Sequence, residues 1–99
     1  MKESELERRL VRGVQALGGC AYKFVSPGNV GVPDRLVILP GGRIVFVELK
    51  TERGSTSKMQ DYQIGKLRGL GAEVRVLRGA VEIAGFLDWC FEVLRGLIR

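Results

Sequence analysis

The sequence contains no histidine, and it is poor in cysteine, tryptophan and proline. Without an imidazole the chain cannot build a serine or cysteine triad, a zinc site with histidine ligands, or histidine-based acid–base catalysis. Any catalysis must therefore use carboxylates, lysines and metal ions bound through oxygen. The two cysteines, Cys20 and Cys90, lie far apart and without metal-site spacing, which predicts free thiols in a reducing compartment.

Long apolar runs are also missing, and the charged start of the chain does not resemble a signal peptide. No stretch approaches the roughly 20 apolar residues that cross a bilayer. We therefore expect a soluble, intracellular protein without a membrane partner. A length of 99 residues predicts one domain, spanning residues 1–99.

The chain carries sixteen Lys and Arg against eleven Asp and Glu, a formal charge of +5. A small basic domain attracts polyanions, because bound phosphates release their counterions. A well-solvated basic surface without any partner would explain the same composition. Charge thus suggests nucleic acid and leaves the alternative open.

Apolar periodicity predicts a first helix over 4–17 that ends at Gly18-Gly19, and two more helices at 57–70 and 81–98. Runs rich in β-branched residues predict strands at 20–25, 34–39, 43–50 and 72–77. The turn at Gly41-Gly42 makes the second and third strands a hairpin. The predicted fold class is α/β, in the order α-β-β-β-α-β-α, with a mixed central sheet flanked by helices.

One constellation points to chemistry, namely Pro33-Asp34 at a strand start and Glu48-Leu49-Lys50 at the end of the next strand. Side chains alternate along a strand, so Glu48 and Lys50 share a face. In the hairpin, Asp34 lies near them. Carboxylate oxygens and the Leu49 carbonyl are ligands that suit Mg²⁺. Lys50 would orient or deprotonate the attacking water and stabilise the negative charge that develops in phosphodiester cleavage. The alternative is an ordinary surface ion pair beside a strand entry.

Two other features bear on this site, and each has a structural alternative. Glu3 and Glu7 lie four residues apart on the first helix, where acidic residues also favour the helix dipole. Gln60 follows Ser57 at the spacing of a capping box. The sequence does not separate capping from catalysis for Gln60.

Basic residues and a glycine-containing loop are candidates for contacts with the phosphates of a substrate. Backbone amides of the loop 26–32, which includes Ser26 and Gly28, can cradle phosphate oxygens, and a plain turn is the alternative. The candidate basic side chains are Lys23, Arg35, Arg53, Lys58 and Lys66. Taken individually, each of them is better explained as a solvated charge.

The last predicted helix carries two apolar stripes. One of them can face the sheet, and the second has no obvious use in so small a monomer, which favours a dimer. Wrapping of the core within one chain is the alternative. The stripes consist of Ile83, Leu87, Cys90, Leu94 and Leu97, and of Phe86, Trp89 and Val93.

Four segments together resemble a known family. They are 23–28 (KFVSPG), 31–35 (GVPDR), 46–50 (FVELK) and Ser57 with Gln60. In order and spacing these segments are similar to the virus-type replication–repair nuclease (VRR-NUC) domain, a branch of the PD-(D/E)xK nucleases, from Glu3 to about Leu77.

The resemblance implies a Mg²⁺- or Mn²⁺-dependent endodeoxyribonuclease with a restriction-endonuclease-like core and no small-molecule cofactor. Asp34 and Glu48 match the metal ligands, Lys50 the catalytic lysine and Gln60 the family's glutamine. The acidic position of the first helix falls on Glu3, with Glu7 as the fallback.

Stand-alone bacterial and phage members resemble homodimers acting in DNA repair on branched DNA, including four-way (Holliday) junctions. The location expected from this likeness is a bacterial cytoplasm or a phage-infected cell. A sequence-reading restriction-type nuclease and an inactive fold used as a DNA-binding or assembly module are the competing interpretations.

Overall fold

The computed structural model describes all 99 residues, and its elements follow the predicted order. They are α1 (Glu3–Ala16), β1 (Cys20–Lys23), β2 (Arg35–Ile38), β3 (Ile44–Lys50), α2 (Lys58–Gly69), β4 (Val74–Arg78) and α3 (Gly79–Leu94). The α/β fold class and the α-β-β-β-α-β-α order predicted from the sequence are confirmed.

The four strands form one mixed sheet in the order β1-β2-β3-β4. β1 pairs with β2, and β2 with β3, in antiparallel fashion, whereas β4 lies parallel to β3. The β2–β3 connection is the predicted hairpin, and the Leu39 carbonyl accepts a hydrogen bond of 2.9 Å from the Gly42 amide in its turn. β2 and β3 are thereby each paired on both sides, and β1 and β4 form the two edges of the sheet.

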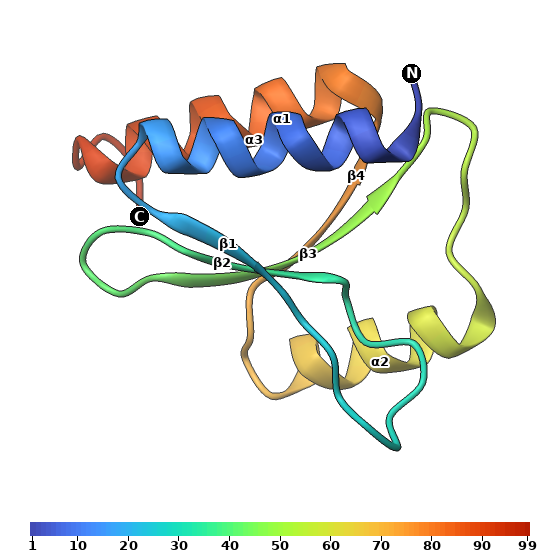
Figure 1. The fold of residues 1–99 in the computed structure, drawn as a ribbon. Coiled ribbons are helices and arrows are strands. Elements are labelled where there is room, and N and C mark those ends of the chain that lie inside the picture. The colour runs from blue at the N-terminus through green and yellow to red at the C-terminus, as the bar shows by residue number, and fades with distance from the viewer.

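The helices cover the two faces of the sheet unequally. Figure 1 shows α1 and α3 side by side on one face and α2 on the other. Alternation along β3 follows this division, because Val45, Val47 and Leu49 are fully buried in the core beneath α1 and α3. Glu48 and Lys50, on the opposite face of the strand, are thus directed to the side of α2.

The helix ends depart slightly from the periodicity. α3 begins at Gly79 rather than residue 81, because the φ of +74° at this glycine turns the chain directly from β4 into the helix. It ends at Leu94 rather than Ile98, because Gly96, with φ +73°, closes the last turn by donating to the Val93 carbonyl at 3.0 Å. None of the helices has the length and hydropathy that crossing a membrane requires.

The second apolar stripe of α3 is used within the chain. Phe86 is only 2% exposed, and its ring stacks on that of Trp89 with centroids 5.8 Å apart. Arg43 and Arg75 lie over the Trp89 ring at 4.8 and 4.3 Å. The expectation that this stripe lacks a partner in a monomer is therefore wrong, and the stripe does not argue for a dimer.

Candidate active site

Asp34 and Glu48 face each other at the open end of the β2–β3 hairpin. The antiparallel ladder pairs Arg35 with Val47, so continuing the register by one residue places Asp34 opposite Glu48. The Leu49 amide donates a hydrogen bond of 3.4 Å to Asp34 Oδ1. Two carboxylates from neighbouring strands are thereby directed to the same end of the sheet.

Lys50 and Gln60 both contact the Glu48 carboxylate. Lys50 Nζ lies 3.3 Å from Glu48 Oε2, and Gln60 Nε2 donates to the same oxygen at 3.2 Å. Glu48 is 4% exposed, so these two contacts supply the polar partners that a buried carboxylate requires. Residues from β3 and α2 thus converge on one oxygen atom.

Gln60 takes part in the helix cap and in this contact at once. Its side-chain Oε1 accepts a hydrogen bond of 2.9 Å from the backbone amide of Ser57. The backbone amide of Gln60 in turn donates to Ser57 Oγ at 3.1 Å. The capping box therefore holds one end of the side-chain amide and leaves Nε2 free to reach Glu48. Capping and site contact, which the sequence left as alternatives, coexist in the same side chain.

The local environment disfavours negative charge on both carboxylates. Burial and the charge of Glu48 raise the pKa of Asp34 to about 6, against the opposing hydrogen bond from the Leu49 amide. Burial also raises the pKa of Glu48, although the neighbouring Lys50 ammonium opposes the shift. The protein groups alone leave negative charge here insufficiently balanced.

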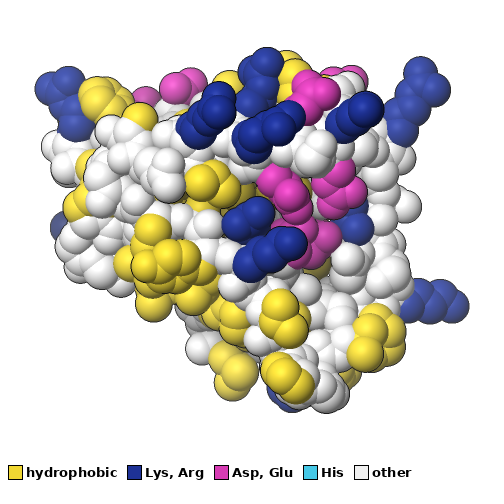
Figure 2. Space-filling view, viewed as in Figure 1, with side chains coloured by type: hydrophobic (Ala, Val, Ile, Leu, Met, Phe, Trp, Pro, Cys, Tyr) yellow, Lys and Arg dark blue, Asp and Glu magenta, His cyan; other side chains and the backbone are white.

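Glu3 and Glu7, both on α1, lie close enough to Asp34 for their charges to act on it. Both add to the raised pKa of Asp34, and Glu3 also contributes to that of Glu48. Glu7 Oε2 is 3.8 Å from Arg35 Nη2, so its charge already has a partner. No group of three or more acidic, cysteine or histidine side chains is gathered closely enough to hold a metal ion. In Figure 2 several acidic side chains form a patch near the middle of the view, bordered by basic ones, while others lie along its upper edge.

Three of the predicted substrate-binding residues are exposed, and Ser26 is half-buried. Lys23 is exposed at the end of β1, and Lys58 is exposed at the first position of α2. Ser26 Oγ accepts a hydrogen bond of 2.9 Å from Asn29, and Gly28 is an exposed turn residue with φ +83°. The loop 26–32 is therefore an ordered turn that carries its own hydrogen bonds.

Arg35 is placed differently from these residues. Its side chain is only 13% exposed and is engaged by Glu7 and by the Ala21 carbonyl, which accepts from Nη1 at 3.2 Å. Its buried Nε has no hydrogen-bond partner. The structure thus directs Arg35 toward α1 and β1.

The arginines of β4, the strand that pairs with β3, were not among the site residues predicted from the sequence. Arg78 is the last residue of β4 and pairs with Lys50 in the parallel ladder. The strand predicted at 72–77 stops one residue short of it. A parallel register between strands separated by a helix has no local signal, so this neighbour of Lys50 emerges only from the structure.

Asp34 facing Glu48, with Lys50 beside it on a mixed sheet, matches the arrangement expected for a nuclease core of the PD-(D/E)xK type. A solved structure described as a VRR_NUC domain matches with a TM-score of 0.82 and 32% identity, over 87% of this chain and 94% of that one. The chain is also 48% identical over 77 residues to "Putative nuclease p44" of Acyrthosiphon pisum secondary endosymbiont phage 1, covering 78% of this chain and 83% of that protein. The chain therefore belongs to the VRR-NUC family. No family model matches it.

Proposed function

We propose that the protein is a divalent-metal-dependent endodeoxyribonuclease that cuts branched DNA such as four-way junctions. The observation that carries this proposal is the pair of carboxylates Asp34 and Glu48 facing each other, with Lys50 Nζ 3.3 Å from Glu48. Membership of a nuclease family and a formal charge of +5 support nucleic acid as the substrate.

The donor set fits Mg²⁺ or Mn²⁺. Mg²⁺ is commonly held by one or two carboxylates and completes its octahedron with waters and substrate phosphates. Asp34 and Glu48 supply hard oxygen ligands in a place where their negative charge is poorly balanced. The Leu49 carbonyl is the proposed third ligand. Of the acidic residues of α1, Glu3 is preferred to Glu7, because Glu7 is already paired with Arg35.

The metal ion would lower the pKa of a bound water and offset charge on the phosphate. Lys50, one residue beyond Leu49 on the Glu48 face, would hold the attacking water by a hydrogen bond and stabilise the negative charge that develops. Gln60 would keep Glu48 oriented through its 3.2 Å contact. The water oxygen would bond to phosphorus and give up a proton, while the bond from phosphorus to the sugar oxygen breaks. That sugar oxygen would take up a proton in turn and leave as a hydroxyl group.

Branched DNA and a homodimer are proposed from the family likeness. A two-fold dimer would present two active sites to paired strands of a symmetric junction. Lys23 and Lys58 are the preferred contacts to the flanking phosphates because both side chains are exposed, with Ser26 and Gly28 in the adjacent turn. Arg35, with a side chain only 13% exposed, is less accessible than the two lysines.

The test is cleavage of labelled four-way junction, flap and plain duplex DNA in Mg²⁺, with Asp34→Ala as the matched inactive variant. Paired, metal-dependent cuts in the junction that disappear in the variant would support the proposal. Unchanged cutting by Asp34→Ala would overturn the assigned site. Binding without cutting in both Mg²⁺ and Mn²⁺ would favour an inactive DNA-binding module.

A further inference from the structure

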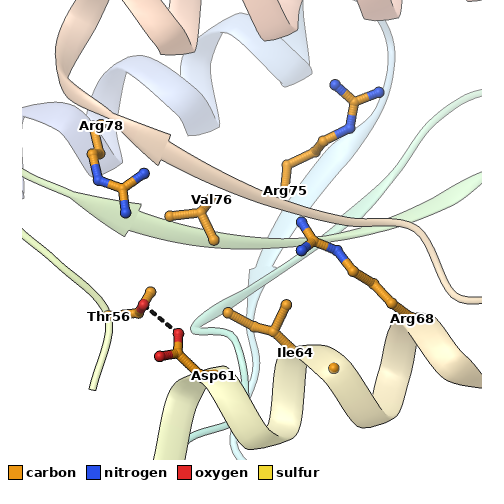
Figure 3. Close-up of a pocket in the computed structure, with 8 residues that line it drawn as sticks. Thr56, Asp61, Ile64, Arg68, Arg75, Val76 and Arg78 are labelled. Atoms are coloured by element: carbon orange, nitrogen blue, oxygen red, sulfur yellow. Dashed lines mark hydrogen bonds between the residues drawn. The ribbon is translucent and has the colours of Figure 1, made fainter. Parts of the chain in front are cut away.

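An arginine-lined hollow of about 590 Å³ opens between α2 and β4. Figure 3 shows Arg68 reaching up from α2 and Arg78 reaching down from β4, with Val76 and Ile64 between them. Most of the lining is polar, and Asp61 is its one acidic residue. A hollow of this composition suits an anionic ligand better than an apolar one.

The hollow adjoins the candidate active site. In the parallel ladder Val76 pairs with Glu48, and Arg78 pairs with Lys50. Neighbouring strands lie about 4.8 Å apart, so the floor of the hollow begins one strand beyond the site on the same face of the sheet. Asp61 directly follows Gln60 on α2, which joins the two regions along the helix as well.

Arg68 and Arg78 are held in place but keep unused donors. Arg68 Nη2 donates to the Val74 carbonyl at 2.8 Å, and Arg78 Nε donates to the Gly54 carbonyl at 3.0 Å. Neither guanidinium forms an ion pair within the chain. A guanidinium anchored through one N–H and still fully charged is preorganised for a phosphate oxygen.

The other charged groups of the lining are already engaged. Arg75 turns away toward α3, where it is 3.3 Å from the Glu73 carboxylate and lies over the Trp89 ring. The Asp61 carboxylate accepts a hydrogen bond from the Thr56 hydroxyl. The free positive charge of the hollow therefore belongs to Arg68 and Arg78.

We infer that this hollow binds the sugar–phosphate backbone of the DNA substrate, about one or two nucleotides from the phosphate that is cut. Arg68 and Arg78 are its phosphate-binding residues. The inference rests on the proposed nuclease function, because it takes the DNA at the site to continue across β4. It assigns a place to the substrate strand outside the carboxylate pair.

Binding should be measured by fluorescence anisotropy with labelled single-stranded, duplex and junction DNA over a range of salt concentrations. An Asp34→Asn background prevents cleavage during the titration. Arg68→Gln and Arg78→Gln remove the charge yet retain an N–H that can reach the carbonyl, while Arg68→Lys and Arg78→Lys retain the charge. Arg12→Gln, at an exposed position of α1, is the control for net charge.

Each Gln variant should weaken binding about 3- to 10-fold. It should also reduce the magnitude of the negative slope of log K against log salt concentration by about 1. The Lys variants should keep most of the slope, and Arg12→Gln should leave it nearly unchanged. Equal slopes for the Asp34→Asn protein and for the same protein carrying both Arg68→Gln and Arg78→Gln would overturn the inference. Displacement of DNA by low concentrations of inorganic phosphate would also overturn it, in favour of a small-anion site.

These outcomes are separable from those of the proposed function. If the unmutated protein cuts DNA and the Gln variants bind it normally, the hollow is not a binding site, although the proposed nuclease function stands. If the unmutated protein never cuts DNA but the Gln variants lose affinity and salt dependence, the hollow is supported as a DNA-binding site and the nuclease proposal fails.

Discussion

Replacing Asp34 by asparagine should stabilise the fold when divalent metal is absent. Burial and the nearby Glu48 charge raise the pKa of Asp34 from its ordinary 3.8 to about 6, so ionised Asp34 destabilises the folded state. Each unit by which the folded-state pKa is raised corresponds to about 1.4 kcal/mol. The gain in the free energy of unfolding from removing this carboxylate therefore has an upper limit of about 3 kcal/mol. Asparagine is neutral, has nearly the same shape and can still accept the hydrogen bond from the Leu49 amide.

The gain should be smaller than this limit and should depend on pH. Asp34 is partly open to solvent, and solvent screening reduces the gain to about 1–2 kcal/mol. For a domain of this size this gain corresponds to a rise in Tm of roughly 4–16 °C. The destabilisation is complete above the folded pKa, near 6, and it fades as the pH falls from 6 toward 3.8. It is lost only below 3.8, where the carboxyl is protonated in both the folded and the unfolded state.

The assay is thermal and urea unfolding of the parent and Asp34→Asn in EDTA at pH 8 and at pH 4.5. Asp88→Asn, at an exposed position of α3, is the matched control and should change little. Adding Mg²⁺ at pH 8 should narrow the gap, because a metal ion that binds the folded parent stabilises it. An asparagine variant less stable than the parent at pH 8, or a gain of equal size at both pH values, would refute the reasoning.

Other substitutions test the remaining parts of the site. Lys50→Ala should lower the cleavage rate while calorimetry still detects Mn²⁺ binding; loss of metal binding would contradict the role given to the lysine. Ser57→Ala and Gln60→Ala should each destabilise the protein by about 1 kcal/mol through the lost cap, but cleavage should fall much further in Gln60→Ala, and equal activities would reduce Gln60 to a cap. Gly31→Ala should destabilise by about 1–3 kcal/mol or more, since its Cβ would lie 2.6 Å from backbone atoms of α2. Gly28→Ala, also at positive φ but with open space around it, should lose only about 1 kcal/mol, and urea titrations that rank the two glycines in reverse would refute this.

The hairpin and its carboxylate pair were predictable because their determinants are local. Strand alternation and the turn at Gly41-Gly42 place Asp34 near Glu48 and Lys50 without knowledge of any distant contact. The family likeness rests on the same segments, so it strengthens a geometry that already followed from the residues.

Features that depend on distant packing could not be predicted in the same way. The sequence shows two apolar stripes on the last helix, but not that Arg43 and Arg75 cover Trp89. It also does not show that Arg78 stands beside Lys50, because α2 separates β3 from β4 in the chain and no local signal gives the register of their parallel pairing. Likewise, the pairing of Arg35 with Glu7 follows from where α1 crosses the sheet.

The arginine that closes one side of the hollow also protects the sheet from self-association. β4 is an edge strand, and unpaired backbone groups on such an edge invite a strand from another molecule. Here the Val74 carbonyl is occupied by Arg68, and the Arg78 amide is occupied by the Glu82 carboxylate at 2.9 Å. Side chains thus blunt both ends of this edge against aggregation or strand exchange.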